Sequence, residues 1–192
     1  RSVDPDGGGV QDMTLFCFDS YGLFTTTVEA KVTPTGNGAG LTGNFEAEVP
    51  ENTRTVHFLA NQNMSEFKED KFRNKSEAEV MALLEGSSGR MIYWARFTCD
   101  PDNDSKIDAQ MADKGNTIKM IRNHAQVSID NPINGWIEVT GFVAYNTNAF
   151  GTVAPYHPEK GFDFEWPGED DPFVTLPQND ARMSDITDVT TA

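Results

Sequence analysis

Two adjoining segments near the start of the chain alternate in a way that is typical of a β-hairpin. In residues 23–32 one side carries Phe24, Thr26, Val28, Ala30 and Val32, and the other carries Thr25, Thr27, Glu29 and Lys31. Such a period of two predicts a half-buried antiparallel strand. Residues 13–18 are apolar on both sides, which predicts a strand deep in the sheet. Asp19 and Gly22 lie between these segments and favour a tight turn.

The same alternation predicts further strands along the chain. They are expected at Phe45, Ala47 and Val49, at Val56, Phe58 and Ala60, and over residues 90–99, 117–130 and 136–145. A glycine-rich loop, residues 35–43, precedes the first of them. Within residues 117–130 the alternation slips by one position, which predicts a β-bulge near Ile121.

One segment departs from the period of two. Ser76 and Glu79 form a capping-box pattern, and Val80, Leu83 and Leu84 follow at helical spacing. Residues 63–73 are expected to form a looser helix with Phe67 inward, and residues 86–89 (GSSG) to end the helical stretch. The prediction is a mainly β, antiparallel β-sandwich with an inserted helical segment at about residues 63–86.

The composition limits the class of partner. The chain has 192 residues, 38% of them hydrophobic, with 13 Phe, which is enough apolar surface for a core. Its net charge of −15 repels phosphate backbones and anionic lipids, so neither nucleic acid nor a membrane surface is an expected partner. No run approaches the roughly 18 apolar residues of a membrane span, so no direct membrane insertion is expected. The absence of a starting Met predicts a processed or trimmed product.

The domain organisation follows from a change in composition. Beyond Tyr145 five prolines interrupt regular structure, and residues 159–192 are strongly acidic. We therefore expect one β domain over residues 1–155 and an acidic, proline-rich arm over residues 156–192. Cys17 and Cys99 each lie in an apolar run and are expected to be buried small hydrophobes, with a disulfide between them as the alternative.

No motif names a catalytic or metal chemistry. Asp100, Asp102 and Asp104 resemble the start of a calcium loop, but Ser105 replaces the turning Gly and Met111 the bidentate Glu. An acidic surface loop is the favoured interpretation, and a weak calcium site completed by distant residues is the alternative.

The remaining candidate residues have structural explanations too. His57, His124 and His157 show no ligand spacing, and the glycine clusters at 7–9 and 36–43 do not open helices as phosphate loops do. Arg122 and Asn123 are interpreted as satisfying a buried bulge, and the sequons at Asn63, Asn74 and Asn103 as chance matches. We therefore predict no catalytic, cofactor or metal site, and a protein that is not an enzyme.

An ordered set of segments resembles a known family. The opening VQDMTLFCFDSYG, Pro50 before RTVHFLAN, the helical segment, IRNHAQVSI and WIEVTGFVAYN occur in the order found in the N-terminal domain of fimbrillins, the subunits of type V pili. The resemblance covers about Val10 to Pro155. It implies a transthyretin-like β-sandwich, a second β domain beyond this sequence, and export as a lipoprotein precursor. It further implies removal of a first strand by a trypsin-like protease after Arg, and filling of the groove by a strand of another subunit.

The resemblance implies a structural subunit of a fimbrium at the outer-membrane cell surface, as a stalk, tip or accessory component contributing to adhesion. Its partners would be other pilus subunits, joined by strand addition, and host or bacterial surface ligands. We expect an unpaired sheet edge or an apolar groove near the N-terminus, with closure of this groove by residues 1–9 or by the acidic arm as the alternative. The alternative is a surface glycan- or protein-binding module that uses exposed rings of Trp94, Trp136 and Trp166.

Overall fold

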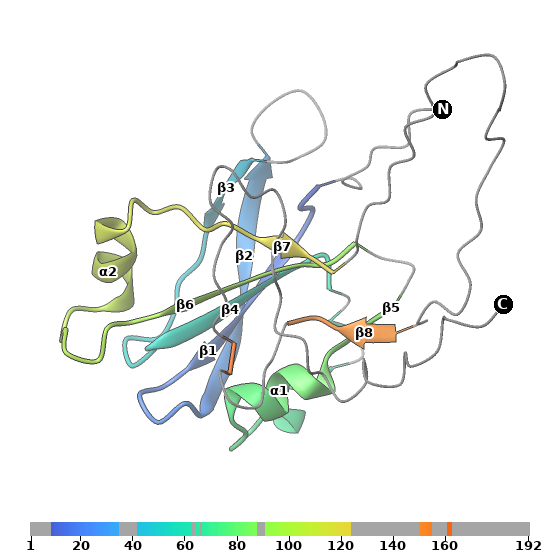
Figure 1. Ribbon diagram of the computed structural model, residues 1–192, viewed down its shortest axis with the longest axis horizontal. Coiled ribbons are helices and arrows are strands. Elements are labelled where there is room, and N and C mark those ends of the chain that lie inside the picture. Colours follow the sequence, from blue (N-terminus) through green and yellow to red (C-terminus); the bar gives the residue numbers. More distant parts are fainter. Residues whose placement is uncertain are drawn as a thin grey trace, which may run out of the picture.

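The described part of the chain is a curled antiparallel sheet with a few short helices. The computed structural model describes residues 9–34, 42–62, 64–65, 67–87, 91–123, 150–154 and 161–162. Six strands form one sheet in the order β3-β2-β1-β4-β6-β7 (Figure 1). They are β1 (Met13–Phe18), β2 (Phe24–Pro34), β3 (Gly43–Glu46), β4 (Thr55–Ala60), β6 (Tyr93–Thr98) and β7 (Ile121–Arg122). The mainly β, antiparallel class is confirmed, and the second layer of a sandwich stays a prediction.

The predicted hairpin is confirmed. The Oδ1 atom of Asp19 accepts hydrogen bonds from the backbone N–H groups of Tyr21 (2.8 Å) and Leu23 (3.0 Å). Gly22 has a φ of +71°, a conformation that glycine adopts without a steric penalty. Strand β1 lies between β2 and β4, and all six of its residues are buried, as predicted from its apolar character on both sides.

The predicted single face of β2 is wrong at its first residue. Cys17 pairs with Thr26, but Phe18 pairs with Phe24, so the register shifts by one residue. The extra residue moves Phe24 to the opposite face from Val28. Phe24 packs with the aromatic residues of β1, whereas Val28, Ala30 and Val32 pack on the other side of the sheet.

The two faces of the sheet carry separate apolar cores. The α1 core lies beneath helix α1 (Glu77–Leu83) and contains Phe16, Phe18, Phe24, Leu59, Phe72, Val80, Met81, Leu84, Ile92, Trp94, Val153, Ala154 and Phe162. The α2 core lies beneath helix α2 (Ile107–Asp113) and contains Met13, Leu15, Cys17, Val56, Phe58, Ala95, Phe97, Cys99 and Ile107. Both thiols are free and buried, which confirms the prediction of small hydrophobes, and burial raises the pKa of Cys17 to about 11.

The predicted capping box is confirmed, but the predicted inward face of its helix is wrong at one position. The Ser76 side chain accepts from the backbone N–H of Glu79, and the Glu79 carboxylate accepts from that of Ser76. Leu83 is 42% exposed, whereas Met81 is 3% exposed and packs in the α1 core with Val80. The helix is rotated relative to the prediction because Met81 and Leu84 share a face at i, i+3 spacing.

The prediction that the helices are confined to about residues 63–86 is wrong. Helix α2 lies outside this window and is as long as α1. The expected looser helix is reduced to the 3₁₀ turn η1 (Glu69–Lys71), with Phe67 half-buried against the α1 core as predicted. Asn63 and Glu66 lie outside the described residues.

Two predicted connections differ from the structure. Residues 86–89 were predicted to end the helical stretch as a loop, but the first two of them belong to β5 (Glu85–Ser87), which pairs with β8 (Phe150–Thr152). The predicted bulge at Ile121 does not occur in the described pairing, because Tyr93 faces Arg122 and Trp94 faces Ile121 in continuous register. The predicted strand over residues 117–130 is wrong at its start, because residues 117–120 have no regular secondary structure. Its remainder over residues 124–130 and the whole predicted strand over 136–145 lie outside the described residues.

The orientation of α1 can be tested with a pair of substitutions in one helix. Met81→Ala removes a side chain from the α1 core and is expected to lower the free energy of unfolding by about 2–5 kcal/mol. Leu83→Ala removes an exposed side chain and should change it by less than about 1 kcal/mol. Urea unfolding followed by circular dichroism measures both, and the reverse order would refute the assigned face.

Candidate functional site

The α2 core is open along a large apolar groove. Its volume is about 1340 Å³, and its lining comes from the strands of the six-stranded sheet, from α2 and from the segment before β7. The apolar lining residues are Val10, Met13, Leu15, Val32, Phe45, Ala47, Val49, Val56, Phe58, Ile107, Met111, Ile118, Met120 and Ile121. The groove therefore reaches the N-terminal end of β1, but β1 itself is paired on both sides, so the one-sided edge lies at β3 and not beside the N-terminal strand.

One side of the groove is the edge strand β3. Phe45, Ala47 and Val49 are half-buried against the α2 core, while Asn44, Glu46 and Glu48 are exposed. This confirms the alternation predicted for the segment. The segment from residue 119 to β7 contributes Lys119 and Arg122, and α2 contributes Asp108 between these two sides, so the β3 side is acidic and the β7 side is basic.

The backbone of β3 is paired on one side only in the part of the chain that the structure describes. Residues 43–46 form a ladder with β2, and β3 is the terminal strand of the sheet. The neighbouring edge of β2 is closed differently. The backbone N–H of Thr27 donates to Oε1 of Glu69 at 3.0 Å, and that of Phe24 donates to the carbonyl of Lys75. Among the described residues, a pairing edge is thus covered at β2 and uncovered at β3.

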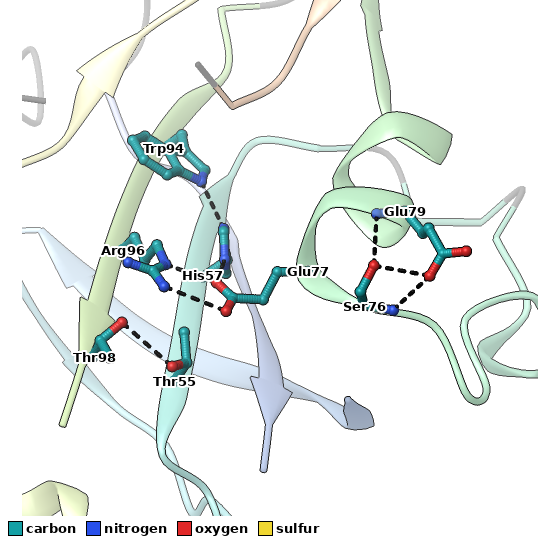
Figure 2. Close-up of polar contacts among 8 residues, drawn as sticks. All are labelled: Thr55, His57, Ser76, Glu77, Glu79, Trp94, Arg96 and Thr98. Carbon is teal, nitrogen blue, oxygen red and sulfur yellow. Dashed lines mark hydrogen bonds and ion pairs between the residues drawn. The ribbon is translucent and has the colours of Figure 1, made fainter. Parts of the chain in front are cut away.

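The other face of the sheet holds a buried polar cluster, which Figure 2 shows. The indole Nε1–H of Trp94 donates to Nδ1 of His57 at 3.0 Å. Because Nδ1 accepts, the ring proton resides on Nε2, which donates to Oε2 of Glu77 at 2.8 Å. The Nε–H of Arg96 donates to the same oxygen at 2.7 Å, so the cluster joins β4, β6 and α1.

This cluster holds a neutral histidine instead of presenting a reactive one. His57 is fully buried, and the ring of Phe162 packs edge-on against it at 4.7 Å. Burial lowers the pKa of His57, against the opposing effect of the Glu77 carboxylate. A general base needs a free ring nitrogen within reach of its substrate, and both nitrogens of His57 are engaged. The cluster resembles a catalytic pair but is arranged as a clamp between α1 and the sheet.

The acidic loop after β6 is held by hydrogen bonds within itself and to the first turn of α2. Oδ1 of Asp100 accepts from the backbone N–H of Asp102, and the Gln110 side chain bonds the backbone of Asp100, Asn103 and Ser105. These bonds explain the loop as a folded connection. Among the residues that the structure describes, no group of three or more His, Cys, Asp or Glu side chains could hold a metal ion.

The remaining candidates are scattered. Trp94 is buried, so its ring is not part of an exposed aromatic surface. Arg122 and Asn123 are half-buried, and they do not line a buried bulge in the described pairing; instead Oδ1 of Asn123 accepts from the backbone N–H of Ile92, and the backbone N–H of Asn123 donates to the Ile92 carbonyl. Of the asparagines in the three sequons, Asn74 is exposed with a φ of +58°. Oδ1 of Asn103 accepts a hydrogen bond from the backbone N–H of Ser105. Five more candidates lie outside the described residues, namely His124, His157, Trp136, Trp166 and Asn63.

Sequence reasoning missed the partners of His57. Glu77 lies 20 positions after His57, and Arg96 lies 19 positions after Glu77, so no local spacing in the sequence connects the three residues. Helix α2 was also missed, although Ile107, Gln110 and Met111 recur at helical spacing. No helix of the described residues is long and apolar enough to cross a membrane.

The clamp predicts a stability that falls with acidification. Burial raises the pKa of Glu77, but the hydrogen bonds from His57 and Arg96 outweigh this effect and lower it to about 2. A carboxyl group with a depressed folded-state pKa stabilises the fold above about pH 4.5 and loses this contribution as the pH falls towards 2. His57 acts in the same direction below about pH 6.5, because the unfolded state binds its proton more readily.

We expect Glu77→Gln to lower the free energy of unfolding at pH 7 by about 3 kcal/mol and to flatten its dependence on pH between 5 and 3. Urea unfolding at several pH values measures both effects. Glu48→Gln is the matched control, because Glu48 is exposed, and it should change stability by less than about 0.5 kcal/mol. Equal pH profiles for wild type and Glu77→Gln would refute the clamp.

Comparisons with known proteins assign no family to this arrangement. No protein-family model, no curated protein and no solved structure matches the chain.

Proposed function

We propose that this chain is a structural subunit of a bacterial cell-surface fimbrium, assembled by β-strand addition and contributing to adhesion. The observation that supports the proposal best is the apolar groove beside a one-sided edge strand. An added strand would pair with the backbone of β3 and insert alternate side chains beside Phe45 and Ala47. The sequence resemblance to the fimbrillin N-terminal domain points to the same role.

Strand addition is favoured over small-molecule binding by the shape of the groove. Its volume of about 1340 Å³ exceeds the roughly 300–1,000 Å³ of ordinary ligand pockets. Its apolar lining runs across the face of a sheet from β3 to β7 and is bordered by an open backbone edge. An extended segment of another chain satisfies both the apolar lining and the backbone groups of that edge.

The finer fold and the location are part of the same proposal. We infer a transthyretin-like sandwich formed by a β domain over residues 1–155, with residues 156–192 as an arm. The protein would reach the outer-membrane cell surface as a lipoprotein precursor and bind other pilus subunits there. A non-catalytic role is consistent with His57, whose two ring nitrogens are occupied. For the alternative of a surface-binding module, Trp94 offers no support because it is buried.

A synthetic peptide provides the direct test of strand addition. An acetylated nonapeptide of alternating Val and Thr should occupy the groove with Val inward and pair with β3. At a concentration of 100 times its Kd, a ligand of the folded state contributes about 2.7 kcal/mol. For a chain of this size we expect a rise in Tm of roughly 5–10 °C by differential scanning fluorimetry.

The specificity of the groove is tested with neighbouring residues of β2. Val32→Glu introduces a charge into the lining and should abolish the Tm shift, whereas Thr33→Glu, at an exposed position of the same strand, should preserve it. A reciprocal probe needs no variant, because a peptide with Asp in place of the inward Val residues should not stabilise the wild type. Equal stabilisation by both peptides would argue against insertion into the groove.

A further inference from the structure

The exposed charges of β3 and of the residues that directly follow it define the chemistry of the strand that this edge would accept. Glu46 and Glu48 are exposed and alternate with the half-buried Phe45 and Ala47. On the adjoining strand, Lys31 is the cross-strand partner of Glu46, and Glu29 is two residues further along on the same face. On the exposed side of the β2–β3 pair, three carboxylates therefore lie near a single ammonium group, that of Lys31.

We propose that the partner of β3 is an extended segment of a different subunit, in which apolar residues alternate with Lys or Arg. This inference rests on the proposed strand addition and deepens it. In a strand paired with β3, every second side chain enters the groove, and the intervening ones lie beside Glu46 and Glu48. Opposite charges at such cross-strand positions are favourable, and like charges are unfavourable.

The same geometry disfavours a second copy of this chain as the partner through its own β3. Two copies paired antiparallel along this edge would set Glu46 and Glu48 of one copy against the same carboxylates of the other. The net charge of −15 on each chain adds a long-range repulsion. A basic strand from another subunit removes both unfavourable terms.

Strand β3 offers an edge whose alternation is set by its own residues. It forms a four-residue ladder with β2, and the half-buried and exposed side chains continue to alternate as far as Val49. The opposite rim carries Lys119 and Arg122, so pairing there would select an acidic strand. The preferred charge of the donor thus reports which rim is used.

The experiment compares two nonapeptides by isothermal titration calorimetry with the full chain, one alternating Val with Lys and the other alternating Val with Glu. We expect the Lys peptide to bind about tenfold more tightly at 20 mM salt. The advantage should shrink to about threefold or less at 500 mM salt, since exposed charges are screened. A Lys peptide of similar composition with two central Pro residues should bind at least tenfold more weakly, because it lacks the donors for a ladder.

A double variant separates the β3 rim from the overall charge. The double variant Glu46→Lys, Glu48→Lys should bind the Glu peptide more tightly than the Lys peptide, which is the reverse of the wild type. Asp102→Lys with Asp104→Lys changes the net charge equally, in an exposed turn that does not line the groove, and should leave at least half of the preference. Equal loss in both double variants would overturn the inference, since only net charge would then be recognised.

The other outcomes are also distinguishable. Equal binding of the Lys and Glu peptides would overturn the charge selection while leaving strand addition intact. Tighter binding of the Glu peptide would overturn it in favour of the rim that carries Lys119 and Arg122. A failure of both charged peptides and of the Val-Thr peptide to bind or to raise the Tm would overturn strand addition itself.

Discussion

The burial of β1 on both of its faces is the constraint on which the rest of the structure depends. All six residues of β1 are buried, and this strand lies between β2 and β4. All six residues of β4, which lies between β1 and β6, are buried as well. A sheet with such central strands needs apolar cover on both sides. On one side Phe72 and the helix α1 provide it, whereas on the other side α2 and residues 118–120 leave a groove between them and β3.

The His57 clamp holds the helix whose leading segment covers one edge of the sheet. Helix α1 has seven residues, which is too short for stability in isolation, so its capping box and its ion pair to Arg96 hold it on the sheet. The segment that leads into α1 places Glu69 and the Lys75 carbonyl on the edge of β2. A buried polar contact on the α1 face therefore supports the closure of β2 and leaves pairing to β3. Loss of the clamp in Glu77→Gln should loosen both the helix and this edge.

The parts of the fold that could be predicted from sequence are those set by local chemistry. The Asp19–Gly22 turn, the capping box at Ser76 and the two-sided burial of β1 each follow from neighbouring residues. The register shift opposite Phe18 leaves no mark on the alternation, because Thr25 suits either face of a strand. The clamp could not be predicted, since its members meet only after α1 has packed on β4 and β6. The position of the groove could not be predicted either, since β3, α2 and residues 118–120 come together only through the order of strands in the sheet.

The relative size of two interactions explains how such a groove would select a strand. Strand β3 has four residues, and only alternate residues direct backbone groups outward, so pairing adds a few hydrogen bonds of about 0.5–1.5 kcal/mol each. Each Val, Leu or Phe side chain buried in the groove contributes about 1.5–3 kcal/mol. Affinity therefore comes mainly from the inward side chains, and the β3 ladder fixes their register. The carboxylates of Glu46 and Glu48 then act on the outward residues, where they discriminate between donor strands of equal apolar content.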